Sequence, residues 1–197
     1  MSLILIPLLC TAYLLGSIPT GIWVGRFKGI DVRRHGSGNV GATNVARVVG
    51  KLPGLMVLLV DVAKGLIPVT FLGEGHESLR ILFGMAAVAG HIWNPFLQFQ
   101  GGKGVATSLG VLLGLDPRVG LGTLLIWLGV VLITRYVSVA SVVAALAAPF
   151  LMTFLGLPTL WILGGIGISL AVIARHRPNL LRLLHGQEHR FGPKALI

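Results

Sequence analysis

Apolar residues run almost without a break along this chain, and short polar segments divide them into seven stretches. The stretches are continuously apolar rather than alternating, which favours helices over half-buried strands. A helix of roughly 17–25 apolar residues crosses the roughly 30 Å hydrocarbon core of a bilayer and satisfies its own backbone hydrogen bonds there. The pattern predicts an all-α, polytopic integral membrane protein with a single domain, residues 1–197. The seven predicted transmembrane helices cover about residues 3–24, 53–72, 79–97, 104–115, 117–134, 138–155 and 158–174.

The fourth stretch is short for a span, and it decides which loops share a face of the membrane. If it crosses, nearly all the loop arginines and lysines fall on the same face as the C-terminal tail, and only Arg80 and Arg118 fall on the other. Cytoplasmic loops carry an excess of Lys and Arg. We therefore expect the N-terminus outside and the C-terminus in the cytoplasm. Because basic residues follow the first stretch rather than precede it, we expect that stretch to be retained rather than cleaved as a signal peptide.

Composition supports the membrane class and narrows the possible partners. The chain is 54% hydrophobic and only 11% charged, whereas a soluble domain carries about a quarter charged residues. The formal net charge of +10 lies mainly in short loops, which indicates membrane topology, and we expect no nucleic-acid partner. The single cysteine, Cys10, excludes an intramolecular disulfide and a cysteine-rich metal site. No histidine spacing matches H-E-x-x-H, and we expect no metal and no cofactor.

The first polar segment, residues 16–50, contains the string GSGNVGATN. Glycines allow backbone N–H groups to approach a ligand closely, and an arginine three residues beyond the string adds a planar charged fork suited to phosphate. The segment predicts an anion-binding loop, and the alternative is a flexible cytoplasmic loop whose arginines only fix topology. The candidate phosphate-binding residues are Ser37, Gly38, Asn39, Gly41, Thr43, Asn44 and Arg47.

The second polar segment, QFQGGKGVATS, covers residues 98–108. It is not a Walker A motif, because Leu97 occupies the place of the first glycine and Gly104 follows Lys103 where Ser or Thr is required. Its glycines precede an apolar helix whose N-terminal N–H groups and dipole favour an anion. The alternative is a glycine hinge with an interfacial lysine. The candidate residues here are Gly101, Gly102, Lys103 and Gly104.

The third polar segment, residues 175–192, continues beyond the last span in an amphipathic helical pattern. A basic amphipathic tail can also simply lie on anionic lipid. His176 is the side chain here whose unperturbed pKa lies near neutrality, so it is a candidate proton donor or acceptor. Asn179, Arg182 and Glu188 complete the candidate residues of this segment.

Within the spans, Asp61 and Lys64 lie three positions apart on one side of a helix, which favours a structural ion pair. A contribution of Asp61 to the site remains an alternative, and His91 and Ser141 are further candidates. No G-x-S-x-G string and no His followed five residues later by Asp occurs, so these catalytic templates are excluded.

Five groups of residues occur in a set order between Gly16 and Glu188. They are GSIPTG, GSGNVGATNVAR, Gly90-His91, GGKGVATS, and the tail pattern of Arg175-His176, Asn179, Arg182-Leu183 and Gly186-x-Glu188. Together they resemble the PlsY-type acyl-phosphate:glycerol-3-phosphate acyltransferases, integral membrane enzymes of bacterial phospholipid synthesis. Two positions depart from that family's pattern. Gln100 replaces a common Lys, and Pro95 comes one place late, with Asn94 in its usual position.

The resemblance implies transfer of an acyl group from acyl phosphate to the 1-hydroxyl of glycerol 3-phosphate, giving lysophosphatidic acid and phosphate. It also implies a bacterial cytoplasmic (inner) membrane, an active site on the cytoplasmic face, and a functional link to the enzyme that makes acyl phosphate. Acyl-CoA and acyl carrier protein are not expected as direct donors. Because acyl phosphate is already activated, a covalent enzyme intermediate is unnecessary.

Under this resemblance, the first loop and Lys103 bind phosphate groups, with Lys103 also a candidate for stabilising the developing oxyanion. Catalytic roles are expected for His176, Asn179 and Lys103, and His176 is a candidate general base. A rival is substrate-assisted transfer, in which a donor phosphate oxygen takes the proton. The functional alternative is a small-anion or phosphate transporter, which predicts polar groups on both faces and at the midplane. The remaining candidate substrate-binding residues are Ser141, Arg182 and Glu188.

Overall fold

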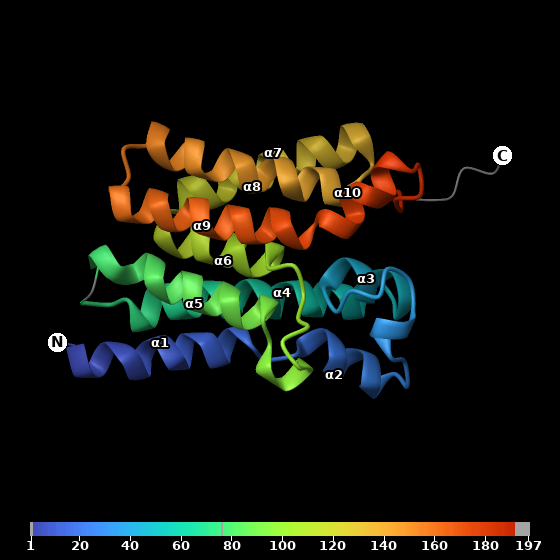
Figure 1. The fold of residues 1–197 in the computed structure, drawn as a ribbon, viewed down its shortest axis with the longest axis horizontal. Helices are drawn as coiled ribbons and strands as arrows, with labels where there is room; N and C mark the ends of the chain where they lie inside the picture. The colour runs from blue at the N-terminus through green and yellow to red at the C-terminus, as the bar shows by residue number, and fades with distance from the viewer. Residues whose placement is uncertain (1, 76, 192–197) are drawn as a thin grey trace.

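The computed structural model describes residues 2–75 and 77–191, and every regular element in these ranges is helical (Figure 1). Long helices that follow one another in the chain run in opposite directions along the long axis of the molecule. The α-helices are α1 (Ser2–Gly16), α2 (Thr20–Phe27), α3 (Ala42–Val48), α4 (Lys51–Ile67), α5 (Arg80–Ile92), α6 (Val105–Leu115), α7 (Pro117–Thr134), α8 (Val137–Phe154), α9 (Thr159–Arg175) and α10 (Arg177–Leu184). Short 3-10 turns occur at Val32–Arg34 (η1), Glu77–Leu79 (η3) and Pro95–Leu97 (η4), and a π-helical turn extends α4 over Pro68–Leu72 (η2).

Four helical segments in the described part are long and apolar enough to cross a membrane: Ile4–Phe27, Lys51–Leu72, Pro117–Thr134 and Val137–Phe154. A fifth is added if α9 and α10, bent by 50°, are taken as one span. The remaining two of the seven expected spans correspond to α5 and to the short apolar α6, and as spans they stay predictions. At about 1.5 Å per residue, the 11 residues of α6 rise about 16 Å, roughly half of a hydrocarbon core.

The expected span at residues 79–97 is too long at its C-terminal end, because α5 ends at Ile92. Asn94 causes this ending together with Pro95, which lacks a backbone N–H to donate. The Asn94 side chain accepts a hydrogen bond from Phe96 N at 3.0 Å and donates one to Ser17 O at 2.5 Å. Asn94 and Pro95, which form one of the two departures from the family pattern, therefore start a 3-10 turn and tie it to the break between α1 and α2.

Small residues allow some helices to approach closely. A Cβ atom on Gly65 of α4 would lie 2.0 Å from the backbone oxygen of Thr107, and one on Gly110 of α6 would lie 1.9 Å from that of Val62. Such contacts exclude any larger residue, and close approach of this kind is a common basis of helix association in membranes. They fix α6 firmly against α4.

The buried pair Asp61 and Lys64 is present as expected from the sequence. Lys64 Nζ lies 2.5 Å from Asp61 Oδ1 and also donates a hydrogen bond of 2.5 Å to Ile18 O. Ile18 lies in the break between α1 and α2, where a carbonyl loses its helical partner. The ion pair therefore has a structural function, which is to join α4 to this break.

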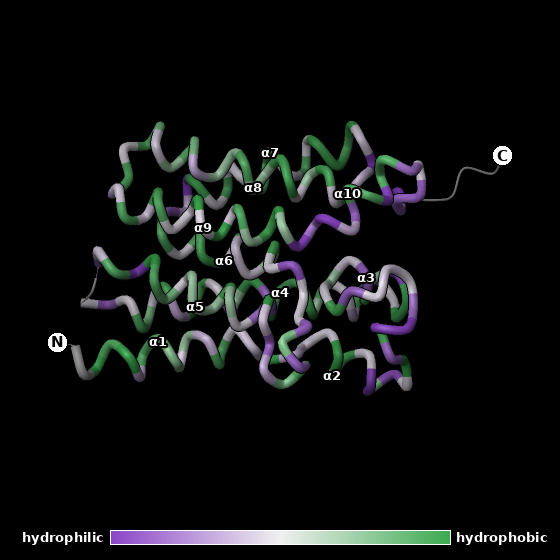
Figure 2. The backbone as a smooth tube through the Cα atoms, in the orientation of Figure 1, coloured by the Kyte–Doolittle hydropathy of each residue, from purple (hydrophilic) through white to green (hydrophobic). Residues whose placement is uncertain are grey.

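Hydrophilic residues gather at one end of the molecule, around α2, α3, α10 and the segment between α5 and α6 (Figure 2). The three polar segments singled out in the sequence thus lie together in space. The opposite end, where α1 begins, carries fewer polar residues. This distribution places the candidate site at one end of the helical bundle.

Candidate functional site

Asn44 organises the first polar loop from the inside. Its side-chain oxygen accepts a hydrogen bond from Ser37 N at 2.8 Å, and its amide group donates to the backbone oxygens of Val32, His35 and Asn39 at 2.9–3.1 Å. Asn44 is only 1% exposed. Its amide is therefore committed to folding the loop, while as a direct phosphate ligand it stays a prediction.

Helix α3 presents the functional face of the first loop. Thr43 and Arg47 lie four positions apart, which places them on one side of the helix. Both line the cavity described below, as do Ser37, Asn39 and Gly41. Gly38 lies outside the lining and occupies a turn, with its N–H donating to His35 O at 3.1 Å.

The glycines of the second segment are needed for close packing. Gly101 N donates to Ile92 O at 3.0 Å, and Gly102 N donates to His91 O at 3.1 Å. A Cβ on Gly102 would lie 2.2 Å from His91 Nε2. The end of α5 already accepts hydrogen bonds from these two N–H groups, and their binding of phosphate stays a prediction.

Arg175, at the end of α9, holds the same segment from its other side. It donates to Gly101 O at 2.9 Å and to Gly102 O at 3.3 Å. The segment is thus held between α5 and α9, which fixes the position of Lys103 at the mouth of the cavity. Sequence reasoning matched Arg175 to a family pattern and gave it no role. Its position immediately before His176 was the available signal.

A chain of hydrogen bonds connects Lys103 with the third segment. Lys103 Nζ donates to Asn179 Oδ1 at 2.5 Å, and Asn179 Nδ2 donates to Glu188 Oε1 at 2.6 Å. Glu188 Oε2 in turn accepts from Arg182 Nε at 2.9 Å. Burial raises the pKa of Glu188, but hydrogen bonds, that from Asn179 first, outweigh it and lower the pKa overall. Arg182 lies outside the cavity lining and acts on the site through Glu188.

Lys103 is a cation held in an environment that disfavours its charge. Burial, together with the nearby cations Arg182, Arg175 and Arg47, lowers its pKa to about 8, and Glu188 only partly opposes this. An incoming phosphate would relieve both the burial cost and the repulsion. The site is therefore electrostatically prepared for an anion.

His176 lies in the bend after α9 and is 2% exposed. Its Nδ1 lies 2.8 Å from Val172 O, which makes Nδ1 the donor and leaves Nε2 as the acceptor. Burial, aided by the charge of Lys103, lowers its pKa to about 4. Burial thus moves the pKa of His176 away from its unperturbed value near neutrality, and its role as a proton acceptor stays a prediction. His176 is a neutral and weakly basic group at pH 7.

The chain beyond α10 folds back over the site. Phe191 N donates to Arg135 O at 2.7 Å, and Arg190 Nε donates to Tyr136 OH at 2.9 Å. These contacts attach residues 187–191, here called the strap, to the turn between α7 and α8. Glu188 of the strap lines the cavity, and the sequence contained no recognisable signal for this attachment.

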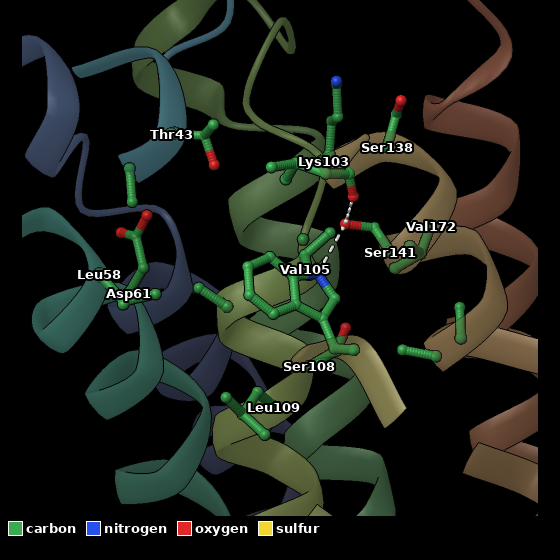
Figure 3. Close-up of a pocket in the computed structure, with 18 of the residues that line it drawn as sticks. Thr43, Leu58, Asp61, Lys103, Val105, Ser108, Leu109, Ser138, Ser141 and Val172 are labelled. Carbon is green, nitrogen blue, oxygen red and sulfur yellow. Dashed lines mark hydrogen bonds between the residues drawn. The ribbon is translucent and has the colours of Figure 1, made fainter. Parts of the chain in front are cut away.

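These elements surround a cavity of about 560 Å³ (Figure 3). Its mouth holds Lys103, Arg47, Asn179 and Glu188, and its body is lined by mainly apolar residues of α4, α6, α7, α8 and α9. Ser141 lies between the two parts, where its hydroxyl accepts from Trp127 Nε1 at 3.2 Å (Figure 3). Within residues 2–75 and 77–191, no cluster of three or more metal-ligating side chains occurs.

A family model described as glycerol-3-phosphate acyltransferase matches residues 6–186, nearly the whole chain. The chain belongs to the glycerol-3-phosphate acyltransferase family. The glycerol-3-phosphate acyltransferase 2 of Moorella thermoacetica is 50% identical over 190 residues, which cover 95% of this chain and 97% of that protein. The glycerol-3-phosphate acyltransferase of Aquifex aeolicus is 46% identical over 183 residues, covering 91% and 95% respectively.

Two crystal structures of PlsY (YgiH), described as an integral membrane glycerol 3-phosphate acyltransferase, match this glycerol-3-phosphate acyltransferase fold. The glycerol 3-phosphate form superposes with a TM-score of 0.92, and the lysophosphatidic acid form with 0.89. Both are 44% identical to this chain and cover 95% of each chain. The family and the membrane class expected from the sequence are therefore confirmed.

Most of the predicted site residues meet at this cavity, but not all of them. Gly38, Gly101, Gly102 and Arg182 lie outside its lining and shape or hold its walls. Their assignment to direct substrate contact stays a prediction. The predicted residues that line the cavity are Ser37, Asn39, Gly41, Thr43, Asn44, Arg47, Lys103, Gly104, Ser141, His176, Asn179 and Glu188, and Asp61 and His91 line it as well.

Proposed function

We propose that this glycerol-3-phosphate acyltransferase takes its acyl group from an acyl phosphate and transfers it to the 1-hydroxyl of glycerol 3-phosphate. The products are lysophosphatidic acid and inorganic phosphate. The observation that carries the proposal is the continuity of the cavity, in which a cationic mouth opens directly into an apolar body. An acyl phosphate has the same division between a phosphate head and an apolar chain, and the neighbouring PlsY structures include glycerol 3-phosphate and lysophosphatidic acid forms.

Two cations at the mouth are suited to the two substrate phosphates. Among the described residues, the ion pairs include neither Lys103 nor Arg47, whereas Arg182 is paired with Glu188. Arg47 can bind a phosphate through its planar fork, and Lys103 can neutralise a phosphate or a developing oxyanion as a point charge. Binding both substrates side by side supplies much of the acceleration expected for an already activated donor.

The reaction needs no covalent enzyme intermediate. The acceptor oxygen attacks the acyl carbonyl carbon, the bond between that carbon and the bridging phosphate oxygen breaks, and phosphate leaves with the electron pair. The hydroxyl proton goes to an oxygen of the departing phosphate, which becomes more basic as its bond to the acyl carbon breaks. Burial makes His176, whose pKa is about 4, a weak base by comparison. His176 then serves to orient the acceptor rather than to remove its proton.

We propose seven membrane crossings, with α5 and α6 as the two short ones, the N-terminus outside and the C-terminus in the cytoplasm. The gathering of the polar segments at one end of the bundle supports this arrangement (Figure 2). It places the mouth of the cavity at the cytoplasmic face of a bacterial inner membrane, where both phosphorylated substrates and the enzyme that makes acyl phosphate are found. A transporter of small anions instead requires a polar path through the midplane, and the body of this cavity is mainly apolar.

The test is an assay of the purified protein in lipid vesicles with palmitoyl phosphate and glycerol 3-phosphate. We expect equal amounts of lysophosphatidic acid and phosphate, no product from palmitoyl-CoA, and loss of activity in Lys103→Ala. Lys51→Ala is the matched control, because Lys51 is exposed at the start of α4 and lies outside the cavity. Product from palmitoyl-CoA alone would contradict the proposed donor, and accumulation of labelled phosphate inside vesicles without product would favour the transporter.

A further inference from the structure

The apolar body of the cavity has a defined depth. Its deepest lining positions are Thr123 on α7, Ala148 on α8 and Gly165 on α9, together with Leu112 on α6. In α7, α8 and α9 these positions lie about three turns from the polar end of the helix, which is about 15 Å at about 1.5 Å per residue. This depth is about half of the roughly 30 Å hydrocarbon core. The cavity therefore reaches as far as one leaflet.

One wall of the cavity faces the surrounding lipid. Leu55, Leu58 and Leu59 of α4 line the cavity and are also exposed on the surface of the molecule. An apolar chain can enter or leave between these leucines without crossing the polar mouth. An acyl chain still attached to its phosphate or glycerol phosphate fits this cavity. The polar group would lie in the mouth, and the chain would lie in the apolar body, with the lateral opening to lipid as its way in.

Packed core residues close the far end of the cavity. Leu112 and Ala148 belong to one buried apolar cluster, which also contains the fully buried Met152. A Cβ on Gly165 would lie 2.7 Å from Met152 Sδ, so Met152 lies directly against this glycine. Densely packed interiors resist the insertion of additional methylene groups. The closed end consequently sets a limit on what fits above it.

We propose that Leu112, Thr123, Ala148 and Gly165 form a floor that selects the length of the acyl chain. This rests on the proposed function, since the acyl phosphate supplies the chain that the cavity holds. A chain that ends at the floor fills the cavity completely. A shorter chain leaves part of it empty. A longer chain must push its terminal methylene groups into packed side chains or bend aside between the leucines of α4. The floor therefore determines specificity while the cationic mouth performs the transfer.

Two substitutions with opposite effects test the floor. Ala148→Leu raises the floor and Leu112→Ala lowers it, while Ala147→Leu adds the same bulk to the neighbouring position of α8, outside the lining. The measurement is kcat/KM with lauroyl, myristoyl, palmitoyl and stearoyl phosphate, with the melting temperature of each variant as the check of folding. We expect the stearoyl-to-lauroyl ratio to fall about tenfold or more in Ala148→Leu and to rise in Leu112→Ala, since methylene groups in apolar pockets discriminate by about 10–200-fold. Ala147→Leu is expected to leave the ratio unchanged.

A second measurement separates the floor from the identity of the donor. The affinities of lysophosphatidic acids of the same four chain lengths depend on the cavity and require no acyl phosphate. If the wild-type protein makes no product from any acyl phosphate, the proposed donor is wrong, and these affinities still test the floor. Chain-length ratios that are the same in the wild type, Ala148→Leu and Leu112→Ala would overturn the floor proposal. If Ala148→Leu does not fold, Gly165→Ala, which displaces Met152, serves for the same comparison.

Discussion

Lys103 donates a hydrogen bond of 2.5 Å to the side-chain oxygen of Asn179, and this bond joins the segment before α6 to α10. The two residues are 76 positions apart. Asn179 is itself held by Glu188 of the strap, at 2.6 Å. The position of the ammonium group at the mouth therefore depends on three segments of the chain at once.

Asn179→Ala should lower kcat/KM by about a hundredfold, the usual loss when one group that positions or stabilises the transition state is removed. Lys103 would keep its charge and lose its fixed position. The measurement is steady-state kinetics with palmitoyl phosphate and glycerol 3-phosphate. Gln187→Ala is the control, because Gln187 lies in the same strap with an exposed side chain. Equal activity of the two variants would contradict a positioning role for Asn179.

The activity should decrease as the pH rises through about 8. Lys103 is charged below its pKa of about 8 and neutral above it, so phosphate binding weakens on the alkaline side. The pH dependence of kcat/KM reports the pKa values of groups in the free enzyme. A plot of its logarithm against pH should therefore show an alkaline limb that falls above about pH 8. If the Lys103→Arg variant retains activity, it should lose this alkaline decrease, because a guanidinium group stays charged throughout the pH range of the assay. An identical alkaline limb in both proteins would show that another group is responsible.

His176→Ala should reduce the rate only several-fold and leave the shape of the pH profile unchanged. The reason is that a buried imidazole with a pKa of about 4 contributes orientation rather than proton removal. The comparison uses kcat/KM from pH 5 to pH 9, together with the melting temperature, since loss of this buried side chain also costs about 2–4 kcal/mol of stability. If the variant is fully folded and its kcat/KM still falls about a thousandfold, His176 would have to be assigned as the general base.

Releasing the strap should raise KM more than it changes kcat. Arg190→Ala removes the hydrogen bond to Tyr136 OH and the cation–π contact at 5.3 Å. We expect the strap, and Glu188 with it, to be held less firmly before substrate binds. We expect KM for glycerol 3-phosphate to rise several-fold, with a smaller rise in Tyr136→Phe, which keeps the ring. Arg177→Ala, an exposed residue at the start of α10, provides the control. Unchanged KM in Arg190→Ala would mean that the other contacts of the strap, through Glu188 and Phe191, are sufficient to hold it.

Gly102→Ala should abolish most of the activity, because its Cβ would lie 2.2 Å from His91 Nε2 and would move the segment that carries Lys103. Gly129→Ala is the matched control, since a Cβ at Gly129 of α7 meets no atom within 4 Å. Both variants are compared by kcat/KM and by melting temperature. Near-normal activity of Gly102→Ala would contradict the proposed packing of this segment on α5.

Much of the membrane architecture was predictable from the sequence, because long apolar runs and lysine or arginine in loops are local properties. The C-terminal end of α5, which matched poorly, shows where this reasoning fails. The end of α5 depends on the contact of Asn94 with Ser17, a residue far away in the chain.

The sequence by itself determined that this protein spans a membrane, belongs to its acyltransferase family and carries phosphate-binding residue types in three polar segments. Only the tertiary structure decided what each residue does. The N–H groups of Gly101 and Gly102 bond the end of α5, the amide of Asn44 bonds its own loop, and burial makes His176 a weak base. Hydrogen-bond partners and burial are properties of neighbours in space, and the residue pattern along the chain does not specify them.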